Sequence, residues 1–228
     1  MNLVVFDVDG TLCKTNSVDA DCLTRAFAET LGIPAPASDW SQYKESTDSG
    51  ILQELCRTHL KRDPTMEEAA ACPARFLELL DLSHSENPGR FRAVPGAPEM
   101  MNDLKKDPAW RPAIATGGFR VTALFKLRAA GINIQGVPFA TANDSTSRRG
   151  IIQTAVNRAK SGYSAGEFSR IVYVGDGEWD LRAAHELGIG FVCVLHDIHK
   201  TSPRPGAERT LKDFLDYRAF INALSPTS

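Results

Sequence analysis

The chain has 228 residues, 43% of them hydrophobic and 24% charged, which suits one large α/β domain or a core with a small inserted domain and excludes disorder throughout. Its formal net charge is −2, with acids and bases interspersed, which argues against nucleic acid or an anionic membrane as partner. The five cysteines form no C-x-x-C pair and no apolar stretch could span a bilayer, so we expect a cytoplasmic protein, monomeric or homodimeric.

Short apolar runs alternate with amphipathic stretches along most of the chain. Buried strands are predicted at Leu3–Phe6, Ala113–Ala115, Ile171–Val174 and Phe191–Leu195, and a weaker one at Val137–Ala140. Helices are predicted around Ala97–Lys106, Val121–Ala130, Ile151–Lys160 and Leu181–Leu187, and a last one around Leu211–Ala223 after a proline-rich loop at Ser202–Gly206. This alternation predicts an α/β fold with a doubly wound parallel sheet.

One segment, from about Ser17 to Phe91, has no convincing strand. It shows helical periodicity that is cut by Pro34, Pro36, Pro64 and Pro73. The polar stretch Ser83–Gly89 is interpreted as the linker that returns to the sheet. We therefore expect a core domain of residues 1–16 and 92–228, with a helical domain of residues 17–91 inserted into it.

The first predicted strand ends in an acid pair, Asp7 and Asp9, within the sequence Asp-Val-Asp-Gly-Thr. Side chains alternate along a strand, so the two carboxylates share a face. They would repel each other unless a cation lay between them, and a hard divalent cation suits oxygen ligands. The alternatives are a turn at Asp9 and Gly10, or a calcium loop, although that loop needs its glycine at the sixth place and here it is fourth.

Other predicted strands also end in polar residues. The second strand is followed by Thr116, Gly117 and Gly118, whose hydroxyl and flexible backbone amides could bind a phosphate. The alternative is that Thr116 is an ordinary helix N-cap. Asp176 follows the next long strand and Asp180 lies one helical turn later, where they could complete a metal site or serve as N-terminal helix acids. Ligands bind beyond the carboxyl ends of parallel strands, so these residues are candidates for one site.

A basic pair, Arg148 and Arg149, begins the helix predicted around Ile151–Lys160. A cation here could neutralise a phosphate and the nearby carboxylates, or it could be a solvated arginine. Adjacent helical residues point about 100° apart, so only one arginine can face the site. Arg148 lies three and four residues before Ile151 and Ile152, in line with the buried stripe, and is favoured.

In this order, the motifs resemble those of the haloacid dehalogenase (HAD) superfamily. The residues that carry the resemblance are Asp7–Thr11, Thr116–Gly117, Arg148, and Gly175–Asp176 with Asp180. The helical insertion falls where family members with a C1-type cap carry theirs. The resemblance implies a Rossmann-like core, a mobile α-helical cap, and the branch of phosphatases and phosphomutases, because dehalogenases of the family lack the second acid that Asp9 supplies here.

The resemblance also implies roles for the acids. Asp7 would be the nucleophile that forms an aspartyl-phosphate, and Asp9 would be the general acid and base. Mg²⁺ would be held by Asp7, by the backbone carbonyl of Asp9 and by Asp176. Asp180 would support this site.

The remaining motif residues would contact the substrate. Thr116 and Gly117 would bind the phosphoryl group, and Arg148, where the family more often has lysine, would steady Asp7 and the phosphate.

The expected activity is Mg²⁺-dependent hydrolysis of a phosphate monoester, with a small phosphorylated metabolite as substrate. The alternatives are a phosphomutase similar to β-phosphoglucomutase, or a non-catalytic protein that binds metal or phosphate. Tyr43, Lys44 and the segment Thr47–Gly50 are candidates for substrate contacts, although the segment is also typical of a helix N-cap followed by a turn glycine.

Overall fold

The structure, a computed structural model, describes residues 1–195, 206–207 and 209–225. Within these residues one parallel sheet has the strand order β3-β2-β1-β4-β5-β6. The strands are β1 (Asn2–Phe6), β2 (Trp110–Ala115), β3 (Phe139–Ala140), β4 (Ile171–Gly175), β5 (Gly190–Val194) and β6 (Arg209–Leu211). The chain winds outward from β1 in both directions, so the doubly wound α/β fold is confirmed.

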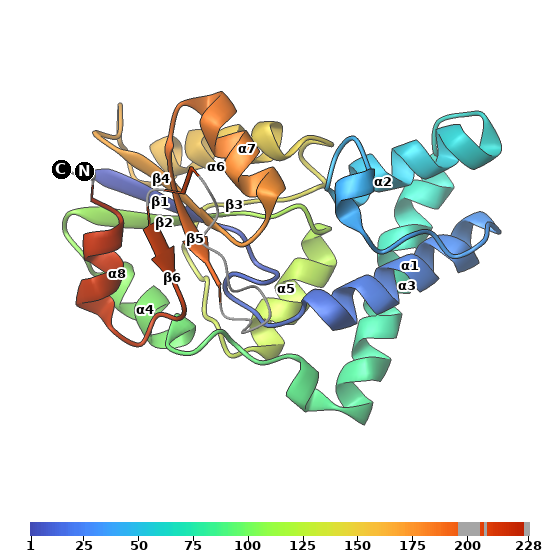
Figure 1. Ribbon diagram of the computed structural model, residues 1–228, viewed down its shortest axis with the longest axis horizontal. Coiled ribbons are helices and arrows are strands. Elements are labelled where there is room, and N and C mark those ends of the chain that lie inside the picture. Colours follow the sequence, from blue (N-terminus) through green and yellow to red (C-terminus); the bar gives the residue numbers. More distant parts are fainter. Residues whose placement is uncertain (196–205, 208, 226–228) are drawn as a thin grey trace.

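Helices cover both faces of the sheet (Figure 1). In the core they are α4 (Ala97–Leu104), α5 (Arg120–Ala129), α6 (Arg148–Gly162), α7 (Glu178–Leu187) and α8 (Tyr217–Ala223). Successive strand residues point to opposite faces. Val4 and Phe6 of β1 therefore pack with α4, α5 and α8, whereas Leu3 and Val5 pack with α6 and α7.

A third apolar cluster lies in a helical layer beyond the carboxyl ends of the strands (Figure 1). Its elements are α1 (Asn16–Leu31), α2 (Asp48–Leu55) and α3 (Met66–Glu86), with a π-helical turn at Cys56–Leu60 and 3₁₀ turns at Trp40–Gln42 and Pro88–Arg90. α1 and α3 pack along each other, and α3 also contacts α5 of the core. We call α1, α2, α3 and their connections the helical layer.

Two expectations about the helical layer were wrong. Pro73 does not interrupt a helix: it lies buried inside α3, next to the apolar stripe that includes Phe76 and Leu80. Packing of that stripe against α1 offsets the lost backbone hydrogen bond. The predicted linker Ser83–Gly89 is mostly helical, because α3 continues to Glu86.

The carboxyl-terminal part of the core also differs from expectation. Leu211 begins no helix but ends β6, which pairs with β5. α8 starts only at Tyr217, where the side chain of Asp216 accepts a hydrogen bond from the amide of Ala219. β2 begins at Trp110 rather than Ala113. Its first half contains an arginine and a proline, so it lacks the apolar run by which the strand was predicted. The loop predicted at Ser202–Gly206 lies outside the described residues except for Gly206.

Candidate active site

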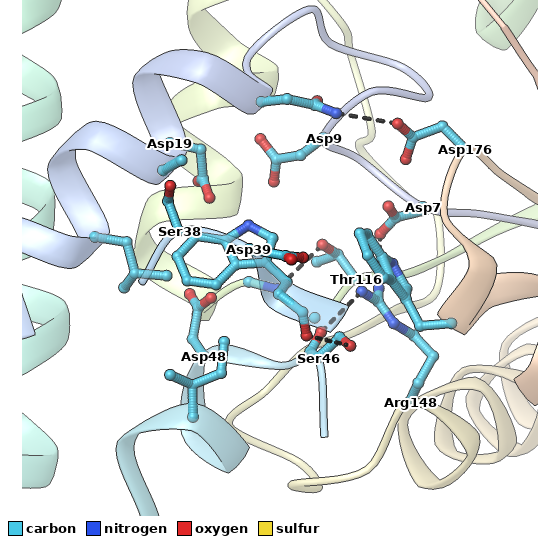
Figure 2. A pocket seen from close by; sticks show the side chains of 18 residues that line it. Asp7, Asp9, Asp19, Ser38, Asp39, Ser46, Asp48, Thr116, Arg148 and Asp176 are labelled. Carbon is cyan, nitrogen blue, oxygen red and sulfur yellow. Dashed lines mark hydrogen bonds and ion pairs between the residues drawn. The ribbon is translucent and has the colours of Figure 1, made fainter. Parts of the chain in front are cut away.

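A cavity of about 270 Å³ opens where the carboxyl ends of β1, β2 and β4 meet the helical layer (Figure 2). It is lined by six of the seven residues that the sequence singled out: Asp7, Asp9, Thr116, Gly117, Arg148 and Asp176. The seventh, Asp180, is completely buried behind them. The structure thus brings these seven predicted site residues to one edge of the sheet.

Asp7 follows β1 directly, and its amide donates to the carbonyl of Val174, which continues the pairing of β1 with β4. This register sets Asp7 beside the end of β4. Carboxylate oxygens of Asp7, Asp176 and Asp180 all lie within 4.8 Å of one another. The two strand ends therefore bring together a group of carboxylates that the sequence separates by about 170 positions.

The two acids after β4 are held differently. Asp176 Oδ2 accepts a hydrogen bond from Nδ2 of Asn16 in α1, at 3.0 Å. Asp180 lies in the first turn of α7 and accepts from the amide of Gly177 at 3.0 Å and from the hydroxyl of Tyr173 at 3.2 Å. Asp176 thus lines the cavity, whereas Asp180 is completely buried behind it.

The loop after β2 brings backbone close to the site. Thr116 is buried, and its Oγ1 accepts a hydrogen bond from the amide of Gly118 at 3.2 Å. A Cβ at Gly117 would lie 2.6 Å from Nη2 of Arg148 and 2.9 Å from the carbonyl oxygen of Ser46. Only glycine fits at this position, because the arginine and the Ser46 backbone both approach the Gly117 backbone.

Arg148 is the first residue of α6, which is capped by the side chain of Ser147. Its Nη1 donates to Asp7 Oδ1 at 2.9 Å, its Nη2 donates to the carbonyl of Ser46 at 3.1 Å, and its Nε lies 3.5 Å from Asp180 Oδ1. Arg148 is 7% exposed, whereas Arg149 is exposed and does not line this cavity. The structure places Arg148, rather than Arg149, against the carboxylates.

The Asp9 carboxylate is held by two residues that the sequence did not associate with it. Its Oδ1 accepts a hydrogen bond from the hydroxyl of Thr15 at 2.5 Å, and its Oδ2 pairs with Nζ of Lys126 at 2.5 Å. The loop turns between the two acids at Gly10, whose φ of +76° and contact with Asp176 leave no room for a side chain. The Asp9 carboxylate therefore belongs to a separate ion cluster.

Burial dominates the electrostatics of the Asp7 group. It raises the pKa of Asp7 well above its ordinary value, Arg148 opposes this rise, and the neighbouring carboxylates of Asp180, Asp176 and Asp9 add to it. Burial likewise raises the pKa of Asp180 against the pull of Arg148. Carboxylate oxygens of Asp7, Asp176 and Asp180 lie within 4.8 Å of one another, and such a donor set fits a divalent cation with oxygen ligands.

Sequence reasoning missed three charged residues at or beside the cavity. Asp19 of α1 and Asp39 line it, and Lys126 of α5 lies completely buried beside Asp19 and Asp9. A signal did exist for two of them. Asp19 falls in the buried stripe of α1 and Lys126 in that of α5, and a charge in an apolar stripe is rarely buried unless it is paired.

The substrate-contact candidates of the helical layer do not line the cavity as expected. Tyr43 and Lys44 are outside it, and the Tyr43 hydroxyl donates to the carbonyl of Ala37. Thr47 is the N-cap of α2, its Oγ1 accepting from the amide of Gly50 at 3.1 Å. The N-cap interpretation of this segment is therefore confirmed, and Asp48 is the residue of the segment that reaches the cavity.

A family model described as "haloacid dehalogenase-like hydrolase" matches residues 1–188 of the chain. No curated protein matches it. In residues 1–195, 206–207 and 209–225, no helix combines the length and apolarity needed to cross a bilayer.

Solved structures share the fold over nearly the whole chain. A hydrolase from Pseudomonas syringae is 24% identical with a TM-score of 0.71, and the match covers 99% of this chain and 100% of that one. CbbY from Rhodobacter sphaeroides, in complex with phosphate, is 19% identical with a TM-score of 0.65, covering 95% and 96%. A protein from Bacteroides vulgatus assigned as a β-phosphoglucomutase is also 19% identical with a TM-score of 0.65, covering 98% and 88%.

Proposed function

The chain belongs to the haloacid dehalogenase-like hydrolase family, and on that premise we propose that it is a Mg²⁺-dependent hydrolase of phosphate monoesters, with a small phosphorylated metabolite as substrate. The observation that carries the proposal is the position of Asp7. Its carboxylate lies at the base of the cavity, held from one side by Arg148 and close to Asp176. A nucleophile fixed in this way could attack a phosphorus atom in line.

In the proposed reaction, an Asp7 oxygen forms a bond to phosphorus as the ester oxygen leaves. Asp9 gives a proton to that oxygen, then takes one from the water that cleaves the aspartyl-phosphate. Thr116 and the Gly117 backbone bind the phosphoryl oxygens. Arg148 holds the Asp7 carboxylate and offsets the negative charge of the transferring group.

Asp7 and Asp176, with the Asp9 carbonyl that the family resemblance implies, would hold Mg²⁺. The cation would offset the repulsion between these carboxylates and a phosphate dianion. Its support is the buried group of Asp7, Asp176 and Asp180, whose carboxylate oxygens lie within 4.8 Å of one another. Asp180 would act from behind, by holding the guanidinium of Arg148.

We further propose that residues 17–91 act as a C1-type cap on a core of residues 1–16 and 92–228. The separate apolar cluster of the helical layer supports this division. So does the cavity lining, which includes Asp19, Trp40 and Asp48 of the helical layer. Figure 2 shows Asp19 and Asp48 on the side of the cavity opposite Asp176. Groups that select the substrate would then come from the cap and groups for the chemistry from the core.

A panel of phosphate monoesters tests the proposal. Purified protein with Mg²⁺ should release inorganic phosphate from at least one member, and the Asp7→Asn variant should not. A panel that yields no phosphate with wild-type protein would contradict the hydrolase proposal.

A phosphomutase remains the second candidate, because a structure assigned as β-phosphoglucomutase shares the fold. It would return the phosphoryl group to a sugar rather than to water. Incubation with β-glucose 1-phosphate and analysis of the sugar phosphates separates the two: glucose 6-phosphate without phosphate release would indicate the mutase.

A further inference from the structure

The Asp9 carboxylate is held by a lysine that does not line the cavity. Lys126, in the middle of α5, is completely buried and is not among the residues that line the cavity. Its Nζ lies 2.5 Å from Asp9 Oδ2, while the hydroxyl of Thr15 holds the other oxygen, Oδ1, at 2.5 Å. Both oxygens of Asp9 are thus fixed, which sets the plane of the carboxylate.

The helical layer encloses the same ammonium group. Lys126 Nζ pairs with Oδ1 of Asp19 in α1, lies near the Asp48 carboxylate of α2, and is 5.8 Å from the centre of the Phe76 ring in α3. Asp48 is itself tied to the core, since its Oδ2 accepts a hydrogen bond from the amide of Phe119 at 2.7 Å. Each of the three helices of the layer therefore contributes one side chain around Lys126.

The cluster groups acidic side chains around one base. Within the part of the chain that the structure describes, the Lys126 ammonium faces the carboxyl groups of Asp9, Asp19 and Asp48. Burial alone would lower the pKa of Lys126, but the carboxylates outweigh burial and raise it, so the ammonium stays charged. Buried ion pairs are weak sources of stability even when balanced. A buried lysine ringed by carboxyl groups is therefore poorly explained by stability alone.

We propose that Lys126 is a positioning residue for the reaction: it holds the Asp9 carboxylate in the orientation from which a proton reaches the leaving oxygen. The inference rests on the proposed function, in which Asp9 is the general acid. Lys126 does not line the cavity and contacts the Asp9 carboxylate instead. Its effect on the reaction is exerted through Asp9.

Leaving-group dependence distinguishes this role from a structural one. Phenyl phosphate has a poor leaving group that needs a proton, whereas 2,4-dinitrophenyl phosphate has a good one that does not. The ratio kcat/KM reports the steps up to the phosphorylation of Asp7, where that proton is used. In Lys126→Met, kcat/KM for phenyl phosphate should fall roughly 10- to 100-fold, which is part of the rate enhancement that a general acid usually supplies. For the dinitrophenyl ester, kcat/KM should fall less than about threefold.

Three further variants complete the test. Lys106→Met makes the same substitution at an exposed lysine and should leave both values unchanged. The double variant Lys126→Met/Asp19→Asn removes one charge of each sign, so it serves as a folded alternative if the single variant unfolds. It should show the same selective loss of kcat/KM for phenyl phosphate. In an Asp9→Asn background, Lys126→Met should add no further selectivity, since the two act through one group.

Equal losses on both esters, or no loss on either, in folded Lys126 variants would overturn the inference while leaving the hydrolase proposal intact. Failure of the wild-type protein to cleave either ester, despite added Mg²⁺, would instead count against the proposed function, and the inference would fall with it. A selective loss that survives unchanged in the Asp9→Asn background would also overturn it, because Lys126 would then act without Asp9.

Discussion

Nη1 of Arg148 donates a hydrogen bond to Oδ1 of Asp7 at 2.9 Å, joining residues 141 positions apart in the sequence. Both side chains are almost completely buried. The carbonyl of Ser46 and the carboxylate of Asp180 restrain the other nitrogens of the guanidinium. This pair fixes the proposed nucleophile in position before any substrate arrives.

Arg148→Ala should lower kcat by about 100-fold or more, because it removes a cation placed for the transferring charge. It should also destabilise the fold by about 3–5 kcal/mol, the usual effect of leaving a buried charge without its partner. Arg149→Ala, at the exposed neighbour, is the matched control and should change kcat less than about twofold. Steady-state kinetics and denaturant unfolding of both variants provide the measurement, and the opposite ranking would assign the role to Arg149.

Asp7→Asn should lower kcat by about a thousandfold or more, because the amide keeps the shape of the side chain and lacks the attacking oxygen anion. The fold should persist, since burial already disfavours the charged form of Asp7. Phosphate release and thermal unfolding check the two halves of this prediction. Near-normal turnover in a folded Asp7→Asn protein would rule out a covalent intermediate on Asp7.

Removal of divalent cations should abolish activity. The carboxylates of Asp7, Asp176 and Asp180 are grouped within 4.8 Å of one another, so a phosphate dianion would be repelled without a cation. Activity should be lost in excess EDTA and return with Mg²⁺, whereas Ca²⁺ should restore it poorly, because it prefers more ligands and looser geometry. Full turnover in excess chelator would contradict the metal site.

Stability should depend on pH through Asp19. Burial, together with the nearby Asp9, raises the pKa of Asp19 from 3.8 to about 6, although Lys126 opposes the rise. Because the folded-state pKa lies above the unfolded-state value, the stabilising contribution is fully present below about pH 4 and is lost as the pH rises through 6. By linkage its full size is about 3 kcal/mol.

Asp19→Asn should remove this dependence. Relative to wild type, the variant should gain free energy of unfolding as the pH rises from about 4 to 6.5, with little further change above that range. Denaturant unfolding of both proteins at pH 4.5, 5.5 and 7 measures the difference. A difference that stays flat across these three values would show that Asp19 titrates in the folded protein as it does in the unfolded chain.

The sequence predicted the strands of the sheet well where the signal was local. Apolar runs marked β1, β4 and β5 to within a residue or so. The same signal failed where tertiary contacts decide the structure. β6 is a three-residue edge strand that is recognisable only beside β5, and Pro73 stays helical because α1 packs against α3.

For the site, the sequence by itself determined which residues follow the strands. Asp7, Thr116 and Asp176 were therefore expected to gather at one edge, because parallel strands carry their carboxyl ends to the same side. Only the tertiary structure decided how the charges pair. Asp9 turned out to pair with Lys126, 117 residues away, and Lys126 in turn with Asp19, 107 residues away. Such pairings depend on how the helical layer packs against α5, and the hydrophobic periodicity of each segment does not predict that packing.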